Sequence, residues 1–232
     1  MQGKIRSAKD RYSAKTAPAS LSEAYKIVLQ SLNWKPAAWK LGNTTKTSQT
    51  ALENTVPFFG PLAAWEVANS PATLEIDKDL KVCGELELLL KLGDADNSSS
   101  SPFDAWAWGF ELPSPSITNL ADLPLSALIM DRCGAFFLVI GQTYSINESR
   151  EGLVRFMMDG KEAARASLDV LANSPEDCAR QFLEEAKQNG FKPEAGQWIA
   201  TGGLTKCVPI TSGKAEIIWN DKPVCQLTVI RK

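Results

Sequence analysis

The chain has 232 residues, of which 44% are hydrophobic and 22% are charged, as in a globular protein of one or two domains. The net charge of −2 excludes the basic footprint that bulk binding to nucleic acid or to an anionic membrane requires. No apolar run approaches the ~20 residues of a membrane-spanning helix. We therefore expect neither nucleic acid nor membrane as a partner.

The sequence contains no histidine. This absence excludes Ser-His-Asp and Cys-His catalysis and most catalytic zinc sites. Any catalysis then depends on carboxylates, lysine, tyrosine, cysteine or a hard metal ion. The five cysteines are widely spaced, which is typical neither of a disulfide framework nor of a zinc site. We expect them to be core thiols of a cytoplasmic protein: Cys83, Cys133, Cys178, Cys207 and Cys225.

The first predicted element is a helix. Ser20 and Glu23 have the spacing of a capping box, and apolar residues then recur at helical spacing up to Leu32. A short strand is predicted over residues 39–42, followed by a polar loop over 43–49. Residues 57–61 (Pro-Phe-Phe-Gly-Pro) are predicted to form a rigid apolar loop.

Residues 82–92 alternate between apolar side chains at even positions and mostly polar ones at odd positions, which predicts a strand. Glu85 and Glu87 leave the same face of this strand, about 7 Å apart along it. Two glutamates at that separation can hold one cation, and oxygen ligands favour Mg²⁺, Mn²⁺ or Ca²⁺. The alternative is a solvated polar face on an edge strand.

A second short alternating run contains Trp106, Trp108 and Phe110 and ends at Glu111. A glutamate between aromatic residues and a proline is either a buried, paired acid or a metal ligand. Further along, residues 136–140 read as a buried strand, and 153–158 begin a hairpin that turns at Asp159–Gly160. The later predicted elements are a helix capped by Ser174, a strand over 198–201 and a terminal hairpin of 215–219 and 224–230.

This pattern is strand-rich and lacks strand-helix alternation, so a doubly wound sheet is not expected. We predict an α+β protein that is effectively one domain. Residues 1–70 form an N-terminal helical lobe in this prediction, packed on a metal-binding, β-rich catalytic core of residues 71–232.

Several segments, in this order and at compatible spacing, resemble the hydratase/decarboxylase branch of the fumarylacetoacetate hydrolase superfamily, which includes 2-keto-4-pentenoate hydratase. The resemblance covers about residues 20–231. It is carried by residues 24–27, 39–44, 57–62, 85–87, 110–113, 139–141 and 195–205.

The resemblance implies a mixed β-sandwich or rolled barrel with flanking helices. It also implies Mg²⁺ or Mn²⁺ held by Glu85, Glu87 and Glu111, with Lys40 as the catalytic residue at the substrate. The implied substrate-binding residues are Leu41, Gly42, Phe59, Gly60, Thr201, Gly202, Gly203 and Thr205. Members of the family are usually dimeric or larger, so a homo-oligomer is expected, and some act with a partner enzyme of the same pathway.

The family's substrates carry a 2-oxo acid group, whose two oxygens can chelate one metal ion so that an enolate is stabilised. The first expectation is therefore a metal-dependent lyase, a hydratase of 2-hydroxy-2,4-dienoates. The first alternative is a decarboxylase of a vinylogous or β-keto acid, of the oxalocrotonate or oxaloacetate type.

A second alternative is a non-catalytic member that serves as a binding or partner subunit. Phe58 stands where hydratases of this branch often carry an acid, and the Phe58–Phe59 and Trp106–Trp108 pairs offer apolar surface for an interface. Glu111 also departs from the family pattern, because Leu112–Pro113 follows it. A third alternative is that the chain shares the fold alone.

Overall fold

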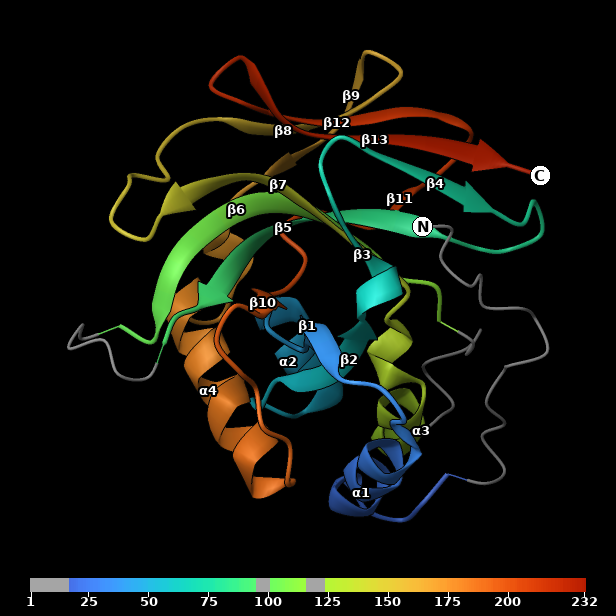
Figure 1. Ribbon diagram of the computed structural model, residues 1–232, viewed down its shortest axis with the longest axis vertical. Coiled ribbons are helices and arrows are strands. Elements are labelled where there is room, and N and C mark those ends of the chain that lie inside the picture. Colours follow the sequence, from blue (N-terminus) through green and yellow to red (C-terminus); the bar gives the residue numbers. More distant parts are fainter. Residues whose placement is uncertain (1–16, 95–100, 116–123) are drawn as a thin grey trace.

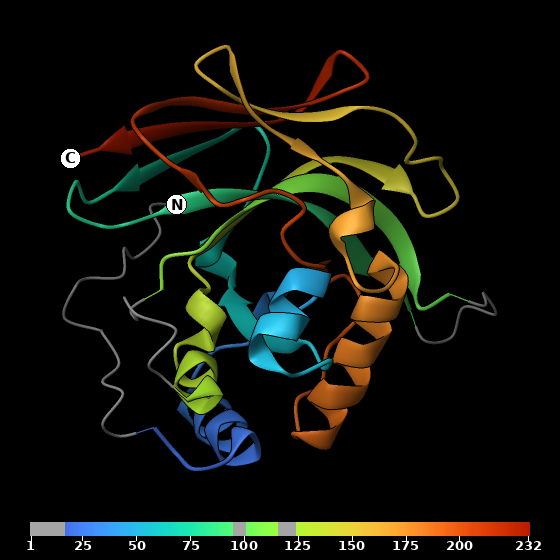
Figure 2. The same ribbon diagram turned by 180° about the vertical axis from the view of Figure 1, so that it is seen from behind.

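The computed structural model describes residues 17–94, 101–115 and 124–232. Two β-sheets lie against each other, and helices cover the concave side of the larger, strongly curved sheet (Figure 1). The helices are α1 (Leu21–Ser31), α2 (Lys46–Leu52), α3 (Leu125–Met130) and α4 (Pro175–Gln188). Seen from behind, α2 lies between α3 and α4 (Figure 2). The expected strand-rich α+β architecture is confirmed.

The larger, eight-stranded sheet has the order β2-β1-β10-β5-β6-β7-β3, and β11 pairs with β5. Its strands are β1 (Pro36–Gly42), β2 (Phe58–Ala63), β3 (Val67–Asn69), β5 (Cys83–Leu92), β6 (Phe103–Leu112), β7 (Phe137–Ser145), β10 (Trp198–Ala200) and β11 (Val208–Pro209). The five-stranded sheet has the order β4-β13-β12-β8-β9. Its strands are β4 (Ala72–Ile76), β8 (Val154–Met158), β9 (Lys161–Ala166), β12 (Gly213–Trp219) and β13 (Lys222–Arg231).

The predicted strand over residues 82–92 is β5, which lies between β10 and β6. It is a central strand, so the reading of its glutamates as the polar face of an edge strand is wrong. The two faces of β5 and β6 have different neighbours. Aromatic side chains of β6 pack against the five-stranded sheet, where Trp106 meets Trp219 and Phe110 meets Phe156. The opposite face lies inside the curve, where Leu89 packs against Ala107.

Capping residues in the sequence correctly predicted where the two longest helices, α1 and α4, begin. The Ser20 hydroxyl accepts a hydrogen bond from the Glu23 amide at 3.2 Å, and the Ser174 hydroxyl accepts one from the Asp177 amide at 3.1 Å. Both are N-caps, because each satisfies a backbone donor that has no partner within the helix. The hairpin of β8 and β9 also turns at Asp159 and Gly160, both with positive φ, as an Asp-Gly turn requires.

Two predictions for the N-terminal part were wrong. The expected polar loop over residues 43–49 contains the start of α2, where Thr45 and Ser48 form a reciprocal capping box. The expected loop over residues 57–61 is largely the buried strand β2. Among the strands that the structure describes, β2 pairs with β1 alone, so it is an edge strand, and Pro61 can occupy it without breaking a sheet hydrogen bond.

The part of the N-terminal lobe that follows α1 is continuous with the core. Residues 36–63 supply β1 and β2 to the same sheet as β5. An aromatic cluster fastens these strands to the helices, and it consists of Tyr25, Trp39, Phe59, Phe182 and Phe191. Among the described residues, no helix is long and apolar enough to cross a membrane.

The prediction that all five cysteines are core thiols is wrong for two of them. Cys83 and Cys207 form a disulfide across 124 residues of sequence, with their Cα atoms 5.5 Å apart. The pairing of β11 with β5 places Pro209 opposite Cys83, and this brings Cys207 within reach. The other three cysteines are buried and free. Since the pairing arises from strand order, no spacing in the sequence indicates it.

Candidate metal centre

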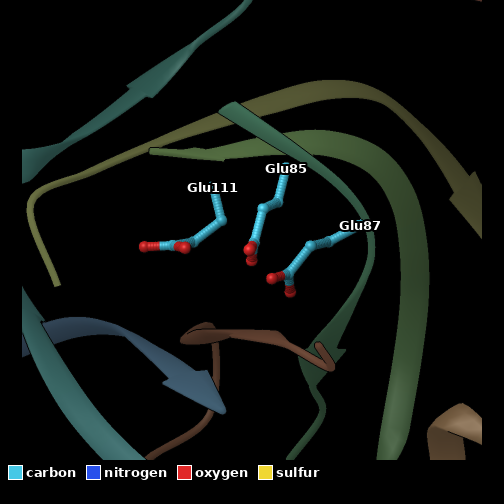
Figure 3. A group of neighbouring side chains, drawn as sticks. All are labelled: Glu85, Glu87 and Glu111. Atoms are coloured by element: carbon cyan, nitrogen blue, oxygen red, sulfur yellow. The ribbon is translucent and has the colours of Figure 1, made fainter. Parts of the chain in front are cut away.

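Three glutamates converge inside the curve of the larger sheet. Strands β5 and β6 are antiparallel, and their register sets Glu85 opposite Glu111, with Glu87 two residues further along β5 on the same face. Each side chain offers one carboxylate oxygen, and these three atoms lie within 4.8 Å of one another. Figure 3 shows the three side chains leaving the same side of the sheet, with the carboxylate of Glu111 turned away from those of Glu85 and Glu87. Glu87 and Glu111 are fully buried, whereas Glu85 is partly exposed.

Lys40 reaches this cluster from β1. Its Nζ donates a hydrogen bond to Glu111 Oε2 at 2.8 Å, and its side chain is almost fully buried. Burial alone lowers the pKa of Lys40, but the carboxylates of Glu111, Glu85 and Glu87 raise it above its ordinary value. Lys40 is therefore an ammonium ion that neutralises part of the acidic cluster.

The ionised forms of Glu87 and Glu111 are disfavoured by their surroundings. Burial raises the pKa of Glu111 to about 7, helped by Glu85 and opposed by Lys40. Burial, followed by the charges of Glu111 and Glu85, raises the pKa of Glu87 well above its usual range. These shifts mean that the cluster holds its negative charges at a cost, which a cation between them removes.

The donor set fits a hard divalent cation. Oε1 of Glu87 and Oε1 of Glu111 are buried and have no hydrogen-bond partner among the described residues. A buried carboxylate oxygen without a donor is costly, so a cation bound to these two oxygens would remove that cost. Three ionised glutamates and one ammonium leave a formal charge of −2. Oxygen donors with this charge suit Mg²⁺ or Mn²⁺.

The segment after β10 lies directly on the glutamates. The amide of Gly202 donates a hydrogen bond to Glu87 Oε2 at 2.8 Å. Gly203 packs so closely that a Cβ there would lie 2.8 Å from Glu85 Oε2. The hydroxyl of Thr201 donates to Leu88 O, and that of Thr205 accepts from the amide of Leu86. This predicted substrate cradle is thus brought to the site, although both hydroxyls are bound to the β5 backbone.

The other predicted substrate-binding residues divide into two groups. Gly42 and Gly60 share the inner face of the sheet with Lys40, and a Cβ on Gly42 would meet no atom within 4 Å. Gly60 packs against the backbone carbonyl of Arg132, so only glycine fits there. Leu41 and Phe59 lie on the opposite face of their strands, where both side chains are buried in the core. Their side chains therefore do not reach the carboxylates.

The apolar pairs suggested as a partner surface are not exposed. Phe58, Phe59, Trp106 and Trp108 are each at most 2% exposed. The prediction that they form an interface is therefore wrong, because they fill the core on either side of the larger sheet.

Two residues near the site were not predicted. The hydroxyl of Thr44 lies against Gly202, at a point that a Cβ on Gly202 would overlap. Cys133 is buried in a turn whose residues Arg132, Cys133 and Gly134 all have positive φ. Burial raises the pKa of the Cys133 thiol to about 12, with a smaller, opposite effect of Lys40. A single threonine or cysteine carries no spacing signal, so sequence patterns alone do not reveal either contact.

No protein-family model matches the sequence, and no curated protein matches it. The structure is similar to that of 4-oxalocrotonate decarboxylase from Pseudomonas putida G7, complexed with magnesium and adipate. That similarity has a TM-score of 0.78 and 16% identity, and it covers 91% of this chain and 86% of that chain.

Two further solved structures are similar over most of the chain. Fumarylpyruvate hydrolase from Pseudomonas aeruginosa, in complex with Mn²⁺ and pyruvate, has a TM-score of 0.61 and 16% identity, and covers 86% of this chain and 91% of that chain. The 5-carboxymethyl-2-hydroxymuconate delta-isomerase from Mycobacterium smegmatis has a TM-score of 0.57 and 16% identity, with 85% and 80% covered. These neighbours are members of the fumarylacetoacetate hydrolase superfamily, so the predicted resemblance is confirmed at the level of the fold.

Proposed function

We propose that this chain is a divalent-metal-dependent lyase of the fumarylacetoacetate hydrolase superfamily, and that it removes from a 2-oxo acid a second carboxylate that is β or vinylogous to the keto group. The observation that carries this proposal is the convergence of three carboxylates, two of them fully buried with an unpartnered oxygen, next to a buried ammonium. Such an arrangement has little stability value by itself, because several charges are removed from water.

Glu85, Glu87 and Glu111 would hold Mg²⁺ or Mn²⁺. When bound, the ion supplies a Lewis acid that draws electrons from a chelating 2-oxo acid. The named neighbours support this assignment, since one is complexed with magnesium and another with Mn²⁺ and pyruvate, itself a 2-oxo acid.

The chain's own residues supply orientation, charge and exclusion of water. Lys40 holds Oε2 of Glu111 and contributes a positive charge toward an anionic substrate. The Gly202 amide fixes one oxygen of Glu87, and burial keeps bulk water from the carboxylates of Glu87 and Glu111 but not from that of Glu85. In decarboxylation the carbon–carbon bond to the departing carboxylate breaks. Its electron pair remains on the substrate skeleton until a proton is added, and the permanently charged ammonium of Lys40 stabilises the negative charge in the meantime.

Decarboxylation requires fewer groups than hydration does. Water addition needs a base or acid that activates water, yet the chain has no histidine, and Phe58 stands where hydratases of this branch often carry an acid. Loss of CO₂ needs only an electron sink and a later proton. Hydration of a 2-hydroxy-2,4-dienoate is the second candidate, favoured by the partial exposure of Glu85, which gives solvent water access to the centre.

A titration with Mn²⁺, followed by electron paramagnetic resonance, tests the metal centre. We expect saturable binding and a spectral change when oxalate, which mimics the chelating end of a 2-oxo acid enolate, is added. The loaded protein is then incubated with oxaloacetate and with a vinylogous keto diacid, and CO₂ is measured. A 2-hydroxy-2,4-dienoate, monitored by ultraviolet absorbance, tests hydration.

The results separate the candidate functions. CO₂ release that requires metal supports the decarboxylase, and loss of dienoate absorbance without CO₂ supports the hydratase. No Mn²⁺ binding overturns the proposed function. Binding without turnover would direct attention to a non-catalytic partner subunit, which native mass measurement with other proteins of the pathway tests.

A further inference from the structure

The Cys83–Cys207 disulfide lies at the far end of the segment that covers the metal centre. We call residues 201–210 the cover segment. It starts where β10 ends and runs alongside β5 to Val82. Cys83 is only two residues before Glu85 on β5, and Cys207 is two residues after Thr205.

The near end of the cover segment is held by hydrogen bonds to β5 and to one glutamate. Both the amide and the hydroxyl of Thr201 donate to Leu88 O, at 3.2 and 2.8 Å. The Gly202 amide then donates to Glu87 Oε2. Through this contact the backbone of the segment orients a proposed metal ligand.

The far end is held by hydrogen bonds to β5, by two hydrogen bonds from Arg231 to Ile210 O, and by the disulfide. The amide of Leu204 donates to Leu86 O at 2.9 Å, and that of Ile210 donates to Val82 O at 3.1 Å. Between them, β11 contributes only two paired residues. The disulfide is the covalent bond that closes this end, so Gly203, pressed against Glu85, lies between two anchors.

The disulfide joins the two cysteine residues that have solvent-exposed surface. Cys83 and Cys207 are both partly exposed, whereas Cys133, Cys178 and Cys225 are buried. We therefore expect a small dithiol to reduce this disulfide, while the three buried thiols stay protected.

We propose that the Cys83–Cys207 disulfide positions the cover segment on the carboxylate cluster, so that its reduction by a dithiol weakens the binding of a divalent cation. In this step the sulfur–sulfur bond takes up two electrons and two protons to give two thiols, and the dithiol becomes a cyclic disulfide. The inference rests on the proposed metal centre and adds redox control to it.

Reduction should weaken cation binding because the cover segment orients the carboxylates that would ligate the cation. Residues that hold a metal ligand from behind typically contribute about 10- to 100-fold to metal affinity. Once the disulfide is open, the far end keeps only its hydrogen bonds and its packing, so the contacts of Gly202 and Gly203 with Glu87 and Glu85 are held less firmly. We therefore expect the Kd for Mn²⁺ to rise about tenfold or more.

The test compares Mn²⁺ binding by the oxidised protein, the protein reduced with dithiothreitol, and the reduced protein after reoxidation. Alkylation followed by mass spectrometry reports the state of each cysteine. Amide hydrogen exchange over residues 202–206 reports whether the cover segment loosens. We expect weaker binding and faster exchange on reduction, and recovery of both on reoxidation.

Two variants serve as controls. The double variant Cys83→Ser/Cys207→Ser should bind Mn²⁺ as weakly as the reduced protein and should not respond to dithiothreitol. Cys178→Ser, which removes a thiol on α4, should keep the full response. If the double variant does not fold, Mn²⁺ binding by the unmutated protein through reduction and reoxidation is the test of the inference.

A purely structural cross-link gives a different result. It lowers Tm on reduction but leaves the Kd for Mn²⁺ unchanged at a temperature where both forms are folded. That outcome overturns the inference and leaves the proposed function intact. If the oxidised protein binds no Mn²⁺, the proposed function and the inference fail together.

Discussion

Glu87 is the residue on which the proposed centre depends most. Its side chain is fully buried, one oxygen accepts the Gly202 amide, and the other has no partner among the described residues. A fully buried carboxylate with one unpartnered oxygen contributes little to the stability of the fold. Its presence is better explained by a ligand that it binds.

Glu87→Gln keeps the shape of the side chain and removes its charge. We expect binding of Mn²⁺ to weaken by at least about 100-fold, since a ligand is lost in addition to its outer contacts. Stability without metal should be retained or raised, because one buried charge is removed. Metal titration and urea unfolding measure the two effects. Glu184→Gln, at an exposed position of α4, is the matched control and should change neither.

Two glycines with positive φ provide a second comparison. Gly202 has φ of 118°, and a Cβ there would overlap the Thr44 hydroxyl, whereas Gly196 has φ of 84° and open space around it. Gly196→Ala should cost only the backbone strain, about 1–2 kcal/mol. Gly202→Ala should destabilise more and should also weaken Mn²⁺ binding, because it displaces the amide that holds Glu87. Equal effects of the two variants on metal binding would contradict this role of Gly202.

At the scale of elements, the register of β5 against β6 positions the glutamates, and the aromatic cluster positions the strand that carries Lys40. The register brings Glu85 opposite Glu111, and the aromatic cluster fastens β1, which carries Lys40, to α1 and α4. The inner and outer faces of β1 therefore have separate roles. Lys40 faces the carboxylates, while Trp39 packs against Phe182 and donates its indole N–H to Gln197 at 2.7 Å.

Phe182→Ala tests this division. Phe182 is fully buried on α4 and packs against both Trp39 and Phe59. Its removal should lower the free energy of unfolding by about 3–5 kcal/mol, from lost burial and the cavity left behind. Under conditions where the variant stays folded, Mn²⁺ affinity should be unchanged. Phe182→Leu, which leaves a smaller cavity, should lose less stability in the same urea experiment.

At the scale of the whole molecule, the stability of the fold depends both on protonation of Glu87 and Glu111 and on metal binding. Without metal, Glu111 has a pKa of about 7 in the folded protein, against 4.5 ordinarily, and the pKa of Glu87 is raised as well. The folded state therefore binds more protons than the unfolded state between these values. The stability that Glu111 contributes is present below pH ~4.5 and is lost as the pH rises through about 7, and the raised pKa of Glu87 acts in the same direction.

A divalent ion should reverse that loss, because it binds the ionised carboxylates of the folded state only. We expect Mg²⁺ or Mn²⁺ to raise Tm by several degrees at pH 8 and by much less at pH 5.5. Thermal unfolding with and without metal at the two pH values measures this difference. In Glu87→Gln the metal-dependent rise at pH 8 should disappear. A metal effect that is larger at pH 5.5 would contradict the assignment of these carboxylates as ligands.

The features predicted correctly from patterns are those that neighbours in sequence decide. Ser20 and Ser174 cap helices through amides three residues away, and the alternation over residues 82–92 set Glu85 and Glu87 on one face of a strand. The resemblance to a family added Lys40 and Glu111 to that pair. The structure then brought all four together, with Lys40 and Glu111 in contact although 71 residues separate them.

By itself, the sequence determined the absence of histidine chemistry, the strand with its paired glutamates and the strand-rich composition of the chain. Only the tertiary structure decided that Leu41 and Phe59 belong to the core, that residues 57–61 lie largely in an edge strand and that Cys83 bonds Cys207. The reason is physical, since strand order and register depend on burial of the whole molecule's apolar surface, which no short segment contains.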